Sequence, residues 1–304
     1  MDISVIVPIH NSRHFLSDLV KSLTNQDYRG SYEIIFVDDG STDGTDTLMK
    51  SLAGNVSNIR QKKSGPATAR NLGIRHSRGR ILAFTDSDCI PNRNWLSELD
   101  RAFKGGVSAV EGKVVTKGRI YSDSHFISSN GGMFLTSNIA FLRRSIRGFD
   151  ERYQYPNRED SDIAFGILSG GKTIVFTKKA VVRHRLLKSS LFGMLKRKLY
   201  FESDVLLFKK YPYLYRKYIR FPFERFTPLY IIFSVAGFIN PLLWIGIPLT
   251  AAAEVKYRKY KFSAVSYIKF LIAQAVGSFL NLFAVVTGCV RYRVNPIRLI
   301  LCNI

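Results

Sequence analysis

A chain of 304 residues with 46% hydrophobic residues is long enough for one large domain or two ordinary ones, and this composition excludes a disordered or fibrous protein. The three cysteines, Cys89, Cys289 and Cys302, form neither a C-x-x-C pair nor an even-numbered framework, which argues against a zinc ribbon and a secreted disulfide scaffold. The first residues lack the pattern of a signal peptide, so we expect the N-terminal domain to lie in the cytoplasm.

The chain is strongly basic, with 45 Lys and Arg residues against 23 Asp and Glu residues and a formal net charge of +22. Such an excess attracts phosphate groups on nucleic acid, on anionic lipid or on a nucleotide. Between Arg183 and Arg225 there are twelve basic residues against three acidic ones, and the most apolar part of the chain follows directly. This position favours a membrane surface over nucleic acid as the partner.

Short β-branched runs alternate with helical periodicity from Ile3 to about Val115. The expected strands are "ISVIVP", "EIIFV" and "RILAFT", and expected helices follow the first two of them. This alternation predicts an α/β fold with a doubly wound, mostly parallel sheet. Such sheets bind ligands outside the carboxyl ends of their strands.

Polar clusters follow all three predicted strands and should therefore meet in one crevice; they are "PIHNS", "DDGSTD" and "DSD". The glycine-rich phosphate loops of dinucleotide-binding proteins and ATPases are absent. In the third cluster, Asp86 and Asp88 flank a single residue, and two such carboxylates repel each other unless a cation joins them. Oxygen ligands of this kind suit Mg²⁺ or Mn²⁺, although aspartates in capping and turn positions give the same pattern.

The later part of the α/β region is less regular. Ile163 and Ile167 indicate a short helix that "GG" ends, and a strand pair, "KTIVF" and "AVVRH", follows it. From Ser189 to about Lys210 the apolar spacing predicts a basic amphipathic helix, which would lie on an anionic membrane or pack on its own domain.

Two long segments carry no charge: residues 227–253, over 27 positions, and residues 270–290, over 21. A helix needs about 20 apolar residues to cross a bilayer, so we predict two transmembrane helices, the first kinked by Pro241 and Pro248. Buried core helices are one alternative. Because the connecting loop holds four basic residues, a shallow hairpin that re-emerges on the same side is another.

The predicted organisation has three parts: an N-terminal domain over residues 1–185, a basic membrane-proximal region over 186–226, and two membrane helices within 227–304. The expected location is the cell membrane, with multi-pass attachment and the N-terminal domain in the cytoplasm. The sequence indicates no oligomeric state.

The motifs of the first 185 residues occur in the order and at the approximate spacing of a known family; they are "SVIVPIHNS", "FVDDGSTDGT", "GPATARNLGI", "AFTDSDCIP" and "NREDSDIAFGI". The chain resembles family 2 glycosyltransferases of the GT-A fold. The resemblance implies an inverting transfer of a sugar from a nucleotide-sugar, usually a UDP- or GDP-sugar, aided by Mg²⁺ or Mn²⁺.

The resemblance also implies roles for individual residues. Pro8 lines the nucleotide pocket, Asp39 resembles the carboxylate that binds the base, and Arg70 faces the nucleotide. Asp86 resembles a contact to the ribose or the metal, and Asp88 resembles a metal ligand.

His184 ends a predicted strand, where a histidine of this family approaches the metal or the diphosphate. We keep it as a candidate metal ligand beside the alternative that a lone histidine is structural or exposed.

Asp160 resembles the catalytic base, with Glu159 beside it. Chemistry supports this role independently, because an acceptor hydroxyl that attacks the anomeric carbon needs a carboxylate to take its proton. The alternative is that "REDSD" is an acidic first turn that favours the helix dipole.

The leading hypothesis is therefore a membrane-attached glycosyltransferase. Its expected partners are a nucleotide-sugar donor, a glycan or lipid-linked saccharide acceptor, and membrane lipids, but no nucleic acid. A polyprenyl-phosphate sugar synthase is the second hypothesis; its acceptor is already an anion, so the carboxylate pair would be superfluous. A non-catalytic protein that binds anionic lipid or nucleic acid leaves the motif carboxylates unexplained, and a glycoside hydrolase needs no nucleotide pocket.

Overall fold

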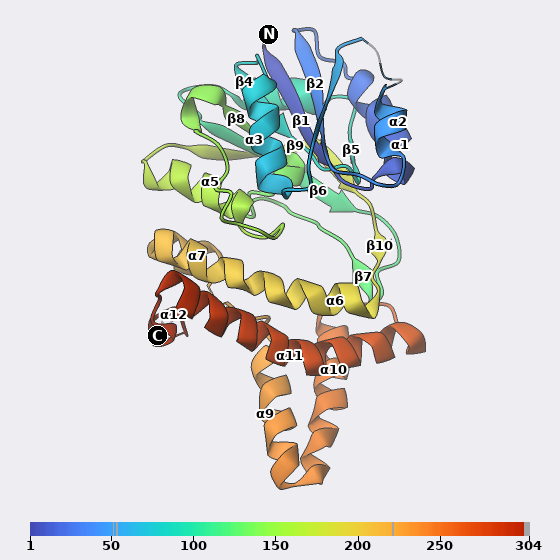
Figure 1. Cartoon of the computed structure of the whole chain (residues 1–304), viewed down its shortest axis with the longest axis vertical. Helices are drawn as coiled ribbons and strands as arrows, with labels where there is room; N and C mark the ends of the chain where they lie inside the picture. The colour runs from blue at the N-terminus through green and yellow to red at the C-terminus, as the bar shows by residue number, and fades with distance from the viewer. Residues whose placement is uncertain (51, 53, 221, 301–304) are drawn as a thin grey trace. The chain divides into compact units, whose positions relative to one another are not determined.

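The structure is a computed structural model that describes residues 1–50, 52, 54–220 and 222–300. The chain forms two compact units (Figure 1). The N-terminal unit contains residues 1–117 and 127–185, and the C-terminal unit contains residues 118–126 and 186–304. The segment 118–126 thus belongs to the C-terminal unit, whereas the domain predicted from the sequence over residues 1–185 includes it.

The N-terminal unit is built on one mixed sheet with the strand order β3-β2-β1-β4-β8-β6-β9-β5. Its strands are β1 (Ile3–Ile9), β2 (Tyr32–Asp39), β3 (Val56–Gln61), β4 (Ile81–Phe84), β5 (Cys89–Pro91), β6 (Ala109–Thr116), β8 (Ile139–Leu142) and β9 (Ile174–His184). The first four run parallel to one another, as the sequence predicts, and their order reverses at β1. Strand β8 is antiparallel to both β4 and β6.

Helices cover both faces of this sheet; they are α1 (Arg13–Thr24), α2 (Thr45–Lys50), α3 (Pro66–His76), α4 (Trp95–Ala102) and α5 (Glu159–Ser169). Alternate residues of β1 face opposite sides of the sheet. Val5 and Val7 pack with the apolar residues of α1 and α4, whereas Ile6 contacts Gly73 of α3. A Cβ atom at Gly73 would lie 2.5 Å from Ile6 Cγ2, so glycine lets α3 pack closely on the sheet.

The predicted strand pair near residues 172–184 is wrong, because both halves form one strand, β9. Strand β9 pairs in parallel with β6 along both halves, with a register shift between Gly112 and Lys113. The irregularity lets one long strand continue where the sequence suggests a turn. The predicted short helix is present as α5 and ends at Ser169, directly before the two glycines.

The C-terminal unit is helical apart from a short antiparallel pair, β7 (Ser124–His125) with β10 (Leu187–Lys188). Its helices are α6 (Leu191–Lys198), α7 (Glu202–Lys210), α8 (Pro212–Tyr218), α9 (Thr227–Ile239), α10 (Gly246–Tyr257), α11 (Ala264–Tyr292) and α12 (Pro296–Ile300). The basic helix predicted near residues 189–210 is thus two helices, α6 and α7, joined by the 3₁₀ turn Leu199–Phe201.

The first long apolar segment forms two helices instead of the single helix predicted over residues 227–253. Asn240 is extended, its side chain accepts a hydrogen bond from the N–H of Leu242, and the 3₁₀ turn Pro241–Ile245 separates α9 from α10. Proline has no N–H to continue the helical pattern, so the chain turns here. In Figure 1, α9 and α10 run side by side as a hairpin.

The second apolar segment lies within α11, which has 29 residues. By length and composition, α11 is the one helix within the described ranges that could cross a membrane. The structure therefore contains one possible membrane helix where the sequence predicts two.

Candidate active site

The carboxylates that follow β2 have different surroundings. Asp43 accepts hydrogen bonds from the N–H and the hydroxyl of Thr45, at the start of α2, and from the N–H of Arg13. Asp38 is fully buried, and its Oδ1 accepts a hydrogen bond from the N–H of Ser41 at 2.9 Å. Both residues shape the turn between β2 and α2, as aspartates in such turns commonly do.

Asp39, the predicted base-binding residue, lies at the end of β2 and organises the loop that leads to α3. Its Oδ1 accepts hydrogen bonds from the N–H of Ser64 at 2.7 Å and from the side chain of Gln61 at 2.8 Å. Its Oδ2 accepts one from the N–H of Gly65 at 2.9 Å. Pro8 is half-buried near the end of β1 and pairs with Val37 of β2, so it lies at the same edge of the sheet. Contact of either residue with a nucleotide stays a prediction.

Arg70 of α3 joins two carboxylates from distant parts of the chain. Its Nη2 donates to Oδ1 of Asp86 at 2.9 Å, and its Nη1 donates to Oε1 of Glu159 at 3.0 Å. Only 4% of Arg70 is exposed, and its guanidinium lies over the ring of Phe149. The observed partners of Arg70 are thus two acidic side chains, and the predicted contact with a nucleotide is not tested.

Asp160 differs from its neighbour Glu159 in exposure and in partners. Both begin α5, but Glu159 is buried against Arg70, whereas Asp160 is half-buried. Oδ1 of Asp160 accepts a hydrogen bond from the N–H of Ser161 at 2.6 Å. Asp160 is therefore the member of this pair that retains access to solvent.

Burial raises the pKa values of both carboxyls. Burial raises the pKa of Glu159 to about 7; the charge of Asp160 adds to this effect, and Arg70 opposes it. Burial also raises the pKa of Asp160, and the N–H of Ser161 opposes this shift. The charge of Asp86 contributes to raising the pKa values of both Asp160 and Asp88, so these groups form one electrostatic cluster.

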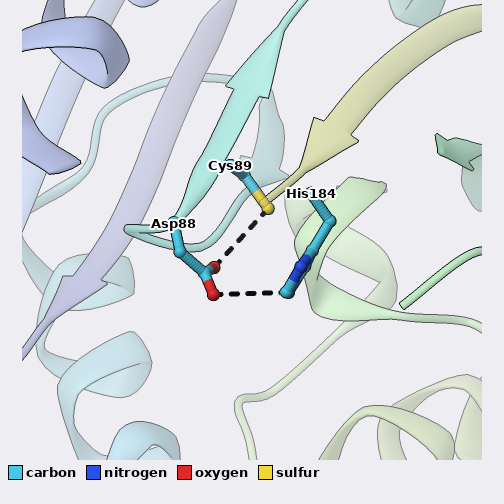
Figure 2. Close-up of side chains that lie close together, drawn as sticks. All are labelled: Asp88, Cys89 and His184. Atoms are coloured by element: carbon cyan, nitrogen blue, oxygen red, sulfur yellow. Dashed lines mark hydrogen bonds and ion pairs between the residues drawn. The ribbon is translucent and has the colours of Figure 1, made fainter. Parts of the chain in front are cut away.

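A second group of side chains lies at the start of β5 and the end of β9. Strands β5 and β9 are antiparallel, and their register places Cys89 opposite His184. Figure 2 shows Asp88, Cys89 and His184 pointing toward one another. One ligand atom from each of the three lies within 4.8 Å of the others, and Oδ2 of Asp88 is 3.5 Å from Nε2 of His184.

The hydrogen bond of His184 fits a metal ligand. Nδ1 of His184 is 2.9 Å from the carbonyl oxygen of Arg185, and a carbonyl can only accept, so Nδ1 carries a proton. In a neutral imidazole the lone pair then lies on Nε2, which faces Asp88, and metal-binding histidines use this arrangement. The carboxylate suits Mn²⁺ or Mg²⁺, and the imidazole favours the transition metal Mn²⁺ of these two. Burial raises the pKa of the Cys89 thiol well above its usual range, so Cys89 stays protonated and is a poor ligand for these cations.

The structure places the predicted residues in two groups, Arg70 with Asp86 and Glu159, and Asp88 with His184. Sequence reasoning missed Cys89 as the third member of the second group, since the pairing of β5 with β9 joins residues almost a hundred positions apart. It also missed Arg70 as a bridge between carboxylates. The only local signal was its position in the motif "GPATARNLGI".

Comparison with known proteins agrees with the fold and the motifs. One similar structure is the mannosyltransferase PcManGT from Pyrobaculum calidifontis, solved with GDP-Man and Mn²⁺. The match covers 91% of this chain and 86% of PcManGT, with 20% sequence identity and a TM-score of 0.59. A second similar structure is TarS 1–349 from Staphylococcus aureus, solved with UDP-GlcNAc. The match covers 96% of this chain and 92% of that chain, with 16% sequence identity and a TM-score of 0.55. The fold is therefore GT-A: a mixed, mostly parallel α/β sheet followed by C-terminal helices.

Sequence relatives cover a shorter part of the chain. Glycosyltransferase AglE from Haloferax volcanii is 36% identical over 118 residues, which are 37% of this chain and 39% of AglE. Glycosyltransferase GlyG from Streptococcus pneumoniae is 36% identical over 101 residues, which are 32% of this chain and 33% of GlyG. The chain thus matches about two fifths of AglE and about a third of GlyG.

One family match covers more than half of the chain. Residues 4–164 match the family described as Glycosyl transferase family 2, and this range includes the predicted nucleotide, metal and base residues except His184. The chain belongs to glycosyl transferase family 2.

Proposed function

We propose that this chain transfers a sugar from a UDP- or GDP-sugar to a hydroxyl group of a glycan or lipid-linked acceptor, with inversion at the anomeric carbon. The observation that carries the proposal is the cluster of carboxylates at this edge of the sheet: Asp86 and Glu159 contact the buried guanidinium of Arg70, and the charge of Asp86 acts on both Asp88 and Asp160. The four carboxylates outnumber Arg70 and Arg158, the two arginines whose charges act on them, so they favour a further cation, and a metal-bound diphosphate at this place would agree with family 2 membership.

Asp88 and His184 would hold the divalent cation, and Asp86 lies close enough to affect Asp88 electrostatically. The bound Mg²⁺ or Mn²⁺ would neutralise the diphosphate leaving group. His184 contributes a lone pair on Nε2, because its Nδ1–H donates to the carbonyl oxygen of Arg185. The buried thiol of Cys89 lies beside both residues and carries no charge.

Asp160 is the proposed base. The acceptor oxygen forms a bond to the anomeric carbon while the bond from that carbon to the diphosphate oxygen breaks, and the hydroxyl proton passes to the carboxylate of Asp160. Its raised pKa, caused by burial, makes Asp160 a better proton acceptor than an exposed aspartate. Arg70 holds Glu159 in place beside it, so Glu159 positions the cluster while Asp160 faces the acceptor.

Donor binding and product stereochemistry test the proposal. We expect UDP or GDP, and one of their sugars, to raise the melting temperature more in the presence of Mn²⁺ than in its absence. With an active donor and acceptor, NMR of the product should show the anomeric configuration opposite to that of the donor. A product that keeps the donor configuration would contradict inversion, and no binding of any nucleotide diphosphate would contradict the donor class.

We propose further that the C-terminal unit attaches the enzyme to a membrane. The support is the long apolar helix α11 together with the exposed apolar residues of α9 and α10. Membrane attachment would bring a lipid-linked acceptor to the enzyme.

A further inference from the structure

Helix α11 has an exposed face that is apolar over most of its length. Every residue between Ala264 and Val290 that is classed as exposed is Ala, Val, Ile or Phe, and the spacing of three and four residues places them on one side of the helix. A surface helix in water carries charged or polar residues on such a face. This stripe, from Val265 through Ile272 and Phe279 to Val290, is therefore suited to an apolar partner.

The opposite face of α11 packs against charged helices. Lys198 of α6 donates to the side chain of Gln274, Glu202 of α7 pairs with Arg291, and Lys209 of α7 donates to the carbonyl oxygen of Tyr292. Near the start of α11, Lys269 lies at the edge of the apolar stripe and pairs with the buried Asp123 at 3.6 Å. Charged neighbours thus accompany α11 over most of its length, and their burial in hydrocarbon costs several kcal/mol per charge. These contacts argue against a path of α11 across the bilayer.

The hairpin of α9 and α10 exposes its most apolar residues at its tip. Phe238 is 80% exposed, Ile239 is 87% exposed and Leu242 is 78% exposed. The segment from Thr227 to Ala253 carries no charge, and the polar side chain of Asn240 in the turn accepts a hydrogen bond from the N–H of Leu242. An exposed apolar projection of this size marks an interaction site.

Basic residues gather at the other end of the hairpin. Arg225 precedes α9, and Lys256, Lys259 and Lys261 lie at or after the end of α10. Anionic headgroups attract such residues, whereas a second copy of this chain, with the same charges, would repel them. With 13 and 12 residues, each arm is about 18–20 Å long, which exceeds one leaflet of hydrocarbon but falls short of the roughly 30 Å core.

We infer that the C-terminal unit binds one leaflet of an anionic bilayer from one side. The α9–α10 hairpin inserts its tip among the acyl chains, the basic residues at its base contact the headgroups, and α11 lies along the interface with its apolar stripe toward the lipid. The protein is then monotopic, and both ends of α11 stay on the side of the N-terminal unit. This inference does not depend on the proposed sugar transfer.

Fluorescence quenching tests the inserted tip. The chain has two tryptophans: Trp95 is fully buried in the N-terminal unit, and Trp244 is 44% exposed in the turn of the hairpin. With phosphatidylcholine–phosphatidylglycerol vesicles that carry bromine on the acyl chains, we expect strong quenching of the full chain. In Trp244→Phe, Trp95 should remain unquenched. Equal emission of the full chain with and without brominated lipid would overturn the inserted tip and favour contact with a second copy.

Thiol labelling tests the one-sided arrangement. Cys89 and Cys289 are buried, so Cys302→Ser provides a background with little reactive thiol, to which Lys261→Cys or Arg293→Cys is added at either end of α11. In sealed vesicles with the N-terminal unit on the outer face, an impermeant maleimide should label both positions without detergent. Labelling of only one position before detergent would mean that α11 crosses the bilayer and would overturn the inference.

Charged substitutions at the tip of the hairpin test how much its exposed apolar side chains contribute to membrane binding, without disturbing the core. Phe238→Glu or Leu242→Glu should weaken vesicle binding by about tenfold or more, because each exposed side chain would lose its transfer into hydrocarbon. Met133→Glu, an exposed apolar residue of the N-terminal unit, is the matched control and should bind normally. Binding that is unchanged in both tip variants would overturn the role of the hairpin, and the melting temperature of each variant reports whether it is folded.

Discussion

Both units bury groups of charged side chains, but the two groups differ in balance. In the N-terminal unit, Asp86 and Glu159 contact the buried guanidinium of Arg70, and Asp88 and Asp160 lie close enough to interact electrostatically with Asp86. In the C-terminal unit, the carboxylates of Glu224 and Glu254 meet Lys198 and Arg258. The first group has an excess of negative charge, whereas the second group is neutral.

The contacts within the C-terminal group are close and numerous. Lys198 Nζ is 2.7 Å from Oε1 of Glu224, and Arg258 Nη2 is 2.8 Å from Oε1 of Glu254. The side chain of Gln274 donates to both carboxylates, and the hydroxyl of Tyr230 donates to Glu254 at 3.1 Å. This network joins α6, α9, α10 and α11 and needs no further ion.

The difference separates a site that binds from a network that holds helices together. Buried carboxylates without enough cations have raised pKa values and gain from a bound cation. Paired charges with satisfied hydrogen bonds keep helices in register, and removal of one partner leaves the other uncompensated. Substitutions in the N-terminal group should therefore change chemistry and binding, and those in the C-terminal group should change stability alone.

The largest expected effect comes from Asp160→Asn, which keeps the shape of the side chain but removes the proton acceptor. Turnover should fall by about 10²- to 10⁴-fold, while donor affinity and melting temperature change little. Steady-state kinetics with a matched melting curve measures this effect, and Asp100→Asn in α4 is the control for loss of an acidic side chain. Near-normal turnover of Asp160→Asn would contradict its role as the base. It would favour either Glu159 as the base or an acceptor that is already an anion.

Arg70→Met should lower the free energy of unfolding by roughly 3–5 kcal/mol, because Asp86 and Glu159 lose their shared buried partner. Donor binding should weaken as well, since Asp86 would no longer be held. Urea unfolding and nucleotide titration give the two measurements. Lys198→Met, at the corresponding place of the C-terminal group, should lower stability to a similar extent and leave nucleotide binding intact. Equal loss of nucleotide binding in both variants would contradict the separation of roles.

Glu159→Gln should change how stability depends on pH. The pKa of Glu159 is raised from 4.5 to about 7 on folding, so between these values the folded state binds more protons, and stability falls as pH rises. Without this carboxyl, the decrease in the free energy of unfolding between these two pH values should be smaller by roughly 1–3 kcal/mol. Urea unfolding of both proteins in the presence of a chelator measures it, and identical slopes would show that Glu159 does not titrate there.

The smallest expected effect is that of Tyr230→Phe, which removes one hydrogen bond from a network that keeps its ion pairs. The free energy of unfolding should fall by about 0.5–1.5 kcal/mol, with nucleotide binding unchanged. A loss as large as that of Lys198→Met would show that the hydroxyl, rather than the charge balance, determines the strength of the network.

Local pattern is sufficient for the parallel core of the N-terminal unit. Val5, Val7, Ile34 and Phe36 lie in short β-branched and aromatic runs between polar turns, and this pattern depends on nearest neighbours alone. The motif carboxylates Asp86, Asp88 and Asp160 are likewise visible, because their spacing and their position after apolar runs do not depend on the fold. The two long segments without charged residues show in the same way that the C-terminal part of the chain is apolar.

Contacts between distant residues are not visible in this way. The bridge from Arg70 to Glu159 joins positions 89 apart, and the antiparallel register of β5 with β9 brings His184 beside Asp88. The two arms of the α9–α10 hairpin look like one span, since hydropathy counts apolar residues but does not show that Asn240 and Pro241 turn the chain back on itself. The amino-acid composition thus indicates which side chains favour burial. Which of them are buried depends on packing against particular neighbours, because burial is a property of the folded structure and not of any single residue.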